Sequence, residues 1–400
     1  MRRTGDLKLI QELNRSIILD TIRHYGPISR SEIAKRHKLS PTTVTSAVSE
    51  LIRDSLVSEV GTGTSNGGRK PILLQFSPDS HFLIGISISG SKITIAEMNL
   101  EAKVRKKEAY SIKAYQGDSV IAYLLQIIEQ FVQPYENLDN CVGISIVTQG
   151  IVDSDNGVIR YNPKLKLKDT PVREIVESRF QIKTWLDNDT NAYLLAEKSI
   201  GDFNHYQNML YVTIGDGLGS SILVNGSIYR GYAGGAGEFG HTTIDRAGVR
   251  CDCGNIGCLE NYVSWPAIYS KLLSGLAKGK QSCIMELAGN DINRISSKTF
   301  CLALAQNDPF AESILEETAS YLATGLVTLV HLFNPEVIIL GGDIALENSL
   351  LISKVTEYVN EYAHGILTEG LAIRPNSLGE DVEVVGAAAV LLQDTFQFSL

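Results

Sequence analysis

The hydrophobic pattern of the first seventy residues predicts three helices followed by a strand-like hairpin. Apolar positions recur at helical spacing over residues 7–25, and Gly26-Pro27 ends that run. Ser29 can cap a short second helix, and Ser40-Pro41 supplies the N-cap and first position of a third. One face of the third helix is apolar, with Val44, Ala47, Val48, Leu51 and Ile52. Residues 56–65 predict the hairpin.

The polar face of the third helix carries short hydroxyl side chains. Helix, helix, tight turn, helix and hairpin form a winged helix-turn-helix, whose last helix enters the major groove of DNA. We therefore expect cations to hold phosphates of double-stranded DNA while hydroxyl groups read base edges. The alternative is a helical bundle for dimerisation. The predicted DNA-binding residues are Arg30, Arg36, Pro41, Thr42, Thr43, Thr45, Ser46, Arg69 and Lys70.

Residues 62–71 are rich in Gly and Ser and form either a plain linker or one that reaches along a groove of the DNA. Beyond them, strands and helices alternate. Two strands joined by a tight turn are expected over residues 82–100, and a hairpin with a Gly-rich bend over 209–231. Helices are expected over 121–132, 190–201 and 318–333, the last leading into a strand at 337–343. This alternation predicts an α/β body with mixed sheets and crossover helices.

The charge distribution separates the two parts. The net charge is −9, but residues 1–70 carry 12 Lys and Arg against 7 Asp and Glu, while the remainder is acidic. A small basic module on a larger acidic body is typical of a protein that contacts nucleic acid. The apolar stretches are too short for a membrane span, and the first residues do not resemble a signal peptide, so we expect a cytoplasmic protein without membrane contact.

Residues 237–260 read GEFGHTTIDRAGVRCDCGNIGCLE and contain one imidazole and three thiols. Three thiolates and one imidazole are a common ligand set for tetrahedral Zn²⁺. An incidental cluster of reduced cysteines is the alternative, and a disulfide framework is implausible in a chain of this length with six cysteines. We predict one structural zinc bound by His241, Cys251, Cys253 and Cys258.

Several motifs together resemble the ROK family of repressors, uncharacterised reading frames and sugar kinases. They are the cysteine segment, DNDTNAYLLAE, IGDGLGSSI, NPEVIILGGD and the terminal GAAAVLL. With the winged helix in front, the chain resembles the sugar-responsive repressors of that family along nearly its whole length. The resemblance implies an actin-like, two-lobed sugar-kinase fold with a sugar in the cleft. We expect a DNA-binding domain and linker at 1–71, a smaller lobe at 72–197 plus 384–400, and a larger lobe at 198–383.

The resemblance also implies a set of sugar contacts. Asn188, Asp189, Glu238, His241 and Glu260 match positions that contact sugar hydroxyls in relatives, and Gly150 is a weaker candidate for close approach of the backbone. Carboxylates and an amide suit a pyranose, whose hydroxyls both donate and accept. His241 can bind zinc through one ring nitrogen and the sugar through the other. As alternatives, Glu260 could be a helix N-terminal charge and Asn188 or Asp189 a cap or turn residue.

The phosphate-binding loops differ from those of the kinases that the chain resembles. Ser87 and Ser89 stand where kinases have an aspartate and a glycine, and Asp216 stands where a hydroxyl would face the phosphates. A carboxylate there repels a polyanion. Asp189 corresponds to the general base of a kinase, but a base without positioned ATP and Mg²⁺ transfers nothing. We therefore expect no catalytic activity, and Asp189 as a vestigial base.

These patterns predict a sugar-sensing transcriptional regulator, most simply a repressor of carbohydrate genes. Its expected partners are a palindromic operator, a monosaccharide or sugar-phosphate effector, and further copies of itself in a homodimer or tetramer. The main alternative is an active sugar kinase with an accessory DNA-binding domain. A third hypothesis is a protein-docking module with a vestigial cleft.

Overall fold

The N-terminal module contains the three helices that the sequence predicts. The computed structural model describes residues 7–63, 70–346 and 348–396. In it α1 (Leu7–Tyr25) precedes α2 (Arg30–His37) and α3 (Pro41–Arg53). The Ser29 side chain and Glu32 form a reciprocal capping box on α2. Ser40 caps α3 by accepting from the Thr43 N–H, with Pro41 in the first turn. Both caps follow directly from the sequence.

The sheet of this module differs from the expected hairpin. It has the order β1-β3-β2, formed by β1 (Ile28–Ser29), β3 (Ile72–Phe76) and β2 (Val57–Thr62). The partner of β2 is therefore β3 rather than a strand within residues 56–65. The sheet of this module consequently includes residues 72–76, which follow the linker expected to end at residue 71. Local periodicity could not reveal this, because β3 pairs across a segment that separates it from β2 in sequence.

The smaller lobe is built on a five-stranded mixed sheet of order β11-β7-β4-β5-β6. Its strands are β4 (Phe82–Ile88), β5 (Lys92–Asn99), β6 (Val104–Ser111), β7 (Cys141–Thr148) and β11 (Thr184–Asn188). Helices α4 (Asp118–Val132) and α5 (Val172–Phe180) share an apolar cluster with one face of this sheet. A second small sheet consists of β8 (Ile151–Asp153), β9 (Val158–Asn162) and β10 (Leu167–Thr170).

The larger lobe contains the other five-stranded sheet, of order β14-β13-β12-β15-β16. Its strands are β12 (Met209–Ile214), β13 (Leu218–Val224), β14 (Ser227–Ile228), β15 (Val337–Gly341) and β16 (Ala372–Pro375). The accompanying helices are α7 (Glu260–Val263), α8 (Trp265–Ala277), α9 (Ile284–Leu287), α10 (Ser297–Ala305), α11 (Pro309–Phe333), α12 (Ser349–Tyr362) and α13 (Gly365–Thr368). Short 3₁₀ turns lie at Phe239–His241, Ile292–Arg294 and Gly379–Asp381.

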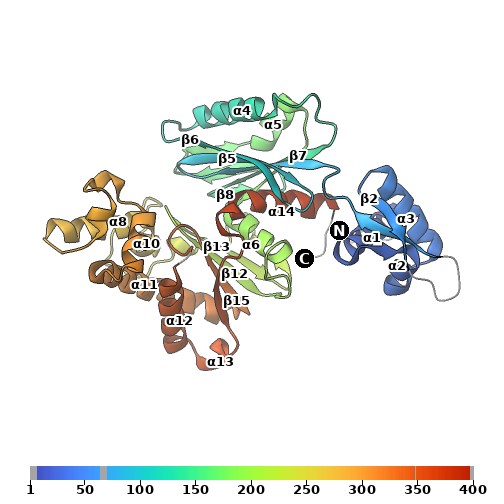
Figure 1. The fold of residues 1–400 in the computed structure, drawn as a ribbon. Coiled ribbons are helices and arrows are strands. Elements are labelled where there is room, and N and C mark those ends of the chain that lie inside the picture. Colours follow the sequence, from blue (N-terminus) through green and yellow to red (C-terminus); the bar gives the residue numbers. More distant parts are fainter. Residues whose placement is uncertain (1–6, 64–69, 347, 397–400) are drawn as a thin grey trace.

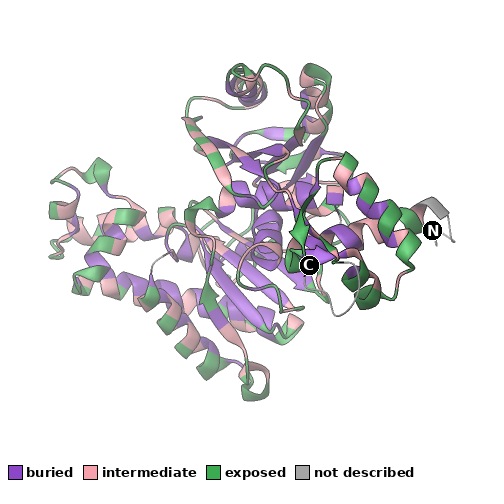
Figure 2. Cartoon of the chain, turned by 45° about the vertical axis from the view of Figure 1, so that its right-hand side comes forward, coloured by how far each residue is buried: buried purple, intermediate pink, exposed green. Residues whose placement is uncertain are grey.

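Two helices link the lobes, because each follows one lobe in the sequence and packs on the sheet of the other. Helix α6 (Asp189–Ser199) follows a strand of the smaller lobe but packs on β12 and β13 of the larger one. Helix α14 (Val382–Phe396) follows the larger lobe but packs on β4 and β7 of the smaller one. The two helices pack on each other at the centre of the molecule (Figure 1). Ten of the eleven residues of α6 and ten of the fifteen residues of α14 are buried. Figure 2 shows that the interior of the molecule is largely buried.

The expected α/β fold with a two-lobed body and a winged helix-turn-helix is confirmed in this arrangement. The winged helix-turn-helix module projects from the side of the body (Figure 1). It shares one apolar cluster with the body, which includes Ile22, Leu74, Leu100 and Phe396. Among the described residues, no helix combines the length and apolarity that crossing a membrane requires.

Candidate functional site

The four predicted metal ligands converge in the loop between the Phe239–His241 turn and α7. The ligand atoms of His241, Cys251, Cys253 and Cys258 all lie within 4.8 Å of one another. Cys253 Sγ lies 3.6 Å from Cys258 Sγ, and Cys251 Sγ lies 3.7 Å from His241 Nδ1. Two thiolates on one tetrahedral Zn²⁺ are separated by about 3.7 Å, given Zn–S bonds of about 2.3 Å. The spacing of these groups therefore fits a tetrahedral zinc ion.

The two ring nitrogens of His241 face different groups. Its Nδ1 points to Cys251, whereas its Nε2 lies 3.8 Å from Glu238 Oε2. If His241 binds a metal through Nδ1, its Nε2 remains directed toward the Glu238 carboxylate. Burial raises the pKa of Glu238, as does the neighbouring charge of Glu260, while His241 lowers it. Glu238 and Glu260 are therefore close enough to interact electrostatically.

Glu260 begins α7 and already has one structural bond. Its Oε2 accepts from the Leu218 N–H at 2.8 Å. A Cβ built on Gly217 would lie 2.8 Å from the same oxygen, so a larger residue there would displace the carboxylate. Glu260 is thus a helix N-terminal acid, and its second oxygen remains for a ligand.

Asn188 sits at the end of β11 and caps α6. Its Oδ1 accepts from the Asn191 N–H at 3.1 Å, and its Nδ2 donates to the Gly150 carbonyl at 3.0 Å. Gly150 has a φ of +93°, and a Cβ there would lie 2.3 Å from the Tyr161 carbonyl oxygen. These contacts bring two sequence-predicted residues together. The cap interpretation of Asn188 holds, and one amide N–H remains for a ligand.

Asp189 is the first residue of α6 and is buried. Its Oδ1 accepts from the backbone N–H of Thr190 at 2.8 Å and from the Thr190 hydroxyl at 3.2 Å. Burial raises the pKa of Asp189 to about 6, and the charge of Glu383 adds to this, while the Thr190 hydrogen bonds and Lys164 oppose it. A carboxyl group tuned in this way can accept or donate a hydrogen bond near neutral pH.

Lys164 lies beside Glu260, one of the predicted sugar contacts, and the sequence analysis did not single it out. It lies between β9 and β10, and its Nζ donates to the Asp216 carbonyl oxygen at 2.8 Å. Its position in a segment with Lys166 and Lys168 offers no local signal that distinguishes it. Only the folded chain separates the lysine that enters the cleft from its neighbours.

The β4–β5 turn and the β12–β13 loop, which the resemblance to kinases relates to phosphate binding, each contain internal hydrogen bonds. Ser89 Oγ accepts from the Ser91 and Lys92 N–H groups and donates to the Lys92 carbonyl, which fastens the β4–β5 turn. Ser87 is buried in β4. In the second loop Asp216 is exposed, and the Gly215 N–H donates to the Gly217 carbonyl.

The predicted DNA-binding residues lie on and around α3. Pro41, Thr42, Thr45 and Ser46 are exposed, and Thr43 is half-buried. The two arginines have other contacts: Arg30 pairs with Glu59 of β2 at 2.9 Å, and the Arg36 guanidinium stacks 3.5 Å from the centroid of the Tyr25 ring. Lys70 is exposed just before β3, and Arg69 lies outside the described residues.

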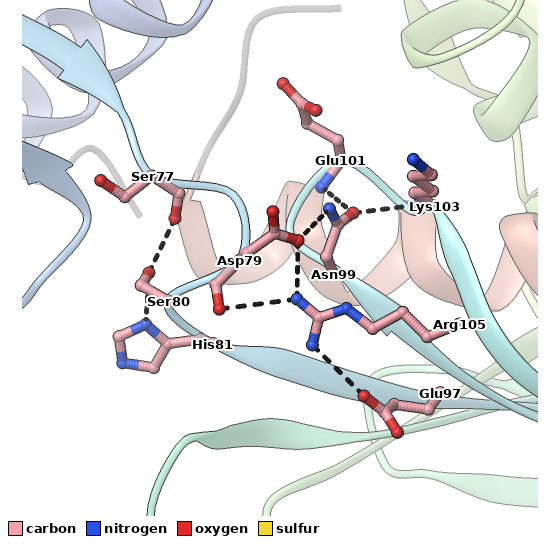
Figure 3. A network of polar contacts seen from close by, with 9 residues as sticks. All are labelled: Ser77, Asp79, Ser80, His81, Glu97, Asn99, Glu101, Lys103 and Arg105. Atoms are coloured by element: carbon pink, nitrogen blue, oxygen red, sulfur yellow. Dashed lines mark hydrogen bonds and ion pairs between the residues drawn. The ribbon is translucent and has the colours of Figure 1, made fainter.

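A polar network joins the winged helix-turn-helix module to the smaller lobe (Figure 3). Residues 77–81 connect β3 to β4, and Asp79 Oδ1 accepts from Asn99 at 2.8 Å and from Arg105 at 2.6 Å. The buried Asn99 in turn accepts from two backbone N–H groups of the β5–β6 turn. On the other side, the Ser77 N–H donates to the Leu56 carbonyl of the winged module. Residues 77–81 are therefore hydrogen-bonded both to the winged module and to the smaller lobe.

Comparison with known proteins gives two family matches. The sequence profile of the ROK family matches residues 83–394, and that of the MarR family matches residues 13–59. A xylose repressor from Caldicellulosiruptor bescii is 31% identical to the chain over 396 residues, which cover 98% of the chain and 99% of that protein.

Two solved structures extend the comparison. A structure described as a ROK family transcriptional regulator, homologous to the E. coli MLC protein, aligns with a TM-score of 0.85 and 29% identity over 97% of both chains. A ROK family glucokinase from Streptomyces griseus, in complex with glucose and AMPPNP, aligns with a TM-score of 0.70 and 24% identity. It covers 77% of this chain and 98% of its own, so this second likeness concerns the fold of the body.

Proposed function

Because this chain belongs to the ROK family, we propose that it is a sugar-responsive DNA-binding transcriptional regulator, a repressor of carbohydrate uptake or catabolism genes. One observation carries the proposal. Hydrogen bonds of residues 77–81 connect a winged helix-turn-helix to a sugar-kinase-like body. The similarity to a xylose repressor over nearly the whole chain supports the same function.

The effector site in this proposal is the cleft between the lobes. The contacting residues are Asn188, Asp189, Glu238, His241 and Glu260, with Gly150 at its edge. Support comes from the hydrogen bond between Asn188 and Gly150 and from the electrostatic proximity of Glu238, His241 and Glu260. Each of these side chains has a donor or acceptor suited to a sugar hydroxyl.

One structural zinc ion belongs to this proposal. His241, Cys251, Cys253 and Cys258 would hold it, which supplies a fixed orientation for His241 and for the loop that ends at Glu260. Burial raises the pKa of the Cys258 thiol to about 12, so metal binding must displace the proton of that thiol.

The body acts as a sensor rather than a kinase. The Ser89 side chain is committed to the β4–β5 turn, and the Asp216 carboxylate adds negative charge to the second loop. The sugar-binding groups are present while these two loops are poorly suited to nucleotide phosphates. The second candidate, an active sugar kinase, draws its support from the fold shared with the glucokinase and from Asp189 at the position of a general base.

DNA recognition involves a homodimer or tetramer in this proposal. Two winged modules related by a two-fold axis would place two copies of α3 on a palindromic operator in double-stranded DNA. Thr42, Thr43, Thr45 and Ser46 read bases, with Pro41 at the start of α3, while Arg30, Arg36, Arg69 and Lys70 approach phosphates. Residues 61–82 carry the effect of a sugar to this module, since a ligand acts only through its different affinity for two conformations.

The proposal is tested by selecting DNA sequences with the full-length protein and then titrating monosaccharides and sugar phosphates into the complex. We expect a palindromic site and release from it by one class of sugar. Glu238→Ala should abolish the sugar response while leaving DNA affinity unchanged, and Thr45→Ala should alter the preferred sequence.

Two results would contradict this proposal. Phosphorylation of a sugar by ATP-Mg²⁺ that is lost in Asp189→Asn would establish the kinase instead. Calorimetry that detects no binding of any sugar, together with DNA affinity that no sugar changes, would favour a body that only docks other proteins.

A further inference from the structure

Lys164 joins the two lobes across the cleft. The turn that carries it belongs to the smaller lobe, whereas the carbonyl that accepts from its Nζ belongs to Asp216, between β12 and β13 of the larger lobe. The aliphatic part of the side chain passes over Gly90, because a Cβ built there would lie 3.2 Å from Lys164 Cδ. One lysine therefore contacts both loops that bind phosphates in the related kinase fold.

The turn around Lys164 is held in place by a buried asparagine. Asn162 is 1% exposed, and its Nδ2 donates to the Gln149 carbonyl at 2.9 Å while its Oδ1 accepts from the Leu165 N–H at 3.0 Å. Gln149 precedes Gly150, which carries the carbonyl bound by Asn188. Lys164 is consequently fixed relative to the sugar-binding end of β11, although its own side chain is exposed.

The ammonium group of Lys164 and the carboxylate of Glu260 approach the same point. A Cβ built on Gly217 would lie 3.3 Å from Lys164 Nζ and 2.8 Å from Glu260 Oε2. Within the described part of the chain, the ammonium donates to a neutral carbonyl and makes no ion pair at 4.0 Å or less. Two of its three N–H donors therefore remain for a ligand.

We propose that Lys164 is a specificity-determining residue of the sugar cleft, which bridges the lobes and restricts the effector to an uncharged monosaccharide. This inference rests on the sugar-sensing function proposed above. A hydroxyl between the two groups can accept from the Lys164 ammonium and donate to the Glu260 carboxylate. A protonated amine at the same position cannot accept from the Lys164 ammonium, because it has no lone pair, so an amino sugar loses this hydrogen bond and places two ammonium groups together.

The opposite charge is rejected by the rest of the cleft. A phosphate or carboxylate on the sugar would meet Glu238, Glu260 and the exposed carboxylate of Asp216. One lysine does not compensate for this number of acidic groups. The acidic groups therefore disfavour an anionic sugar, whereas the discrimination against an amine is confined to the position beside Lys164, and an uncharged polyol satisfies the donors and acceptors of both.

The test is calorimetric titration of the full-length protein with hexoses and pentoses and with the amino and phosphorylated derivative of each. We expect the uncharged form of one sugar to bind most tightly. Lys164→Met should weaken that binding by roughly ten- to a hundredfold, as expected for a charged hydrogen bond, and should reduce the discrimination against the amino derivative. Lys164→Arg, which retains the charge, should preserve that discrimination.

Lys168→Met is the matched control, because Lys168 is an exposed lysine on neighbouring β10. It should bind all the sugars as the wild type does, and thermal unfolding should show that both variants are folded. Unchanged sugar affinity in Lys164→Met, or tighter binding of a sugar phosphate than of its parent sugar by the wild type, would overturn the inference. Absence of any sugar binding by the wild type would instead overturn the proposed function itself.

Discussion

At the scale of single residues, the cleft uses side chains that serve the fold and the proposed ligand site together. Asn188 caps α6 and also binds the Gly150 carbonyl, and Glu260 accepts from the Leu218 N–H while it begins α7. These bonds restrict the side chains to one orientation before any ligand arrives. Such preorganisation lowers the entropic cost of binding. It also means that substitutions at these two positions would affect stability as well as binding.

Asp189 leads to a prediction about pH. Burial raises the pKa of this carboxyl group to about 6, whereas an unfolded aspartate titrates near 4. Between these values the folded protein retains a proton that the unfolded chain has lost, so its stability falls as pH rises through this window. The contribution is on the order of 3 kcal/mol. Below about pH 4 both states are protonated and the contribution is fully present.

The variant Asp189→Asn isolates this effect because an amide does not titrate. Urea unfolding should show that, between pH 4 and pH 6, the free energy of unfolding of the wild type falls relative to that of the variant. Asp139→Asn, which changes an exposed aspartate outside the cleft, is the control. A stability difference between wild type and Asp189→Asn that does not change with pH would contradict the prediction.

At the scale of elements, the loop from residue 237 to residue 260 has little regular structure of its own. It contains a three-residue 3₁₀ turn and two isolated bridges, Thr243–Cys258 and Arg250–Ile256. Its backbone hydrogen bonds close turns within the segment and form no ladder with a neighbouring strand in the described part of the chain, so cross-linking contacts contribute to its conformation. The convergence of four ligand atoms within 4.8 Å supplies such a contact if a metal joins them.

The expected consequence is that the loop depends on zinc. Metal analysis of the purified protein should find about one zinc per chain. Cys253→Ser should reduce the zinc content and lower the melting temperature by roughly 5–10 °C, and it should weaken sugar binding because His241 and Glu260 lose their support. Cys283→Ser, at a cysteine outside the cluster, should retain the metal. Full zinc content and stability in Cys253→Ser would show that the cluster is incidental.

At the scale of the whole molecule, the DNA-binding module is not a freely tethered domain. Its apolar core is continuous with that of the smaller lobe, and the Leu100 N–H donates to the Pro78 carbonyl beside the Asp79 network (Figure 3). Arg23 of α1 lies within electrostatic range of Glu101 in the β5–β6 turn. A movement of the smaller lobe would therefore carry the module with it.

The two lobes are also joined on the far side of β11. Asp187, which is 2% exposed, forms two bonds with Arg230 from the loop after β14. Asp187 and Arg230 line a cavity of about 900 Å³, together with Trp185 and Asp394. Because side chains alternate along a strand, Asp187 faces away from the side of β11 that Asn188 occupies. The lobes are thus joined by this pair as well as by Lys164 and the crossing helices.

Loosening the junction should weaken the communication between sugar and DNA. We expect Asp79→Ala to leave sugar affinity and isolated DNA binding nearly unchanged, while the change in operator affinity caused by saturating sugar falls several-fold. The reason is that Asp79 loses its bonds to both Asn99 and Arg105. Fluorescence anisotropy with labelled operator, with and without sugar, measures this coupling.

Asp381→Ala provides the comparison, since it breaks another exposed ion pair on β6, the one with Lys107, outside residues 77–81. It should retain the full response. If Asp79→Ala responds to sugar as fully as the wild type does, the network is only a surface feature and coupling follows another path.

The sequence by itself determined the elements, because local signals specify them. Apolar periodicity and the Ser40-Pro41 start predicted α1 and α3, and the spacing of Cys251, Cys253 and Cys258 brought three thiols close together along the chain. Only the tertiary structure decided which strand completes the wing, that Lys164 rather than Lys166 or Lys168 crosses the cleft, and that Asp79 fastens the module to Asn99 and Arg105. These contacts join residues far apart in sequence. Their energies depend on the folded geometry, so no local pattern could have indicated them.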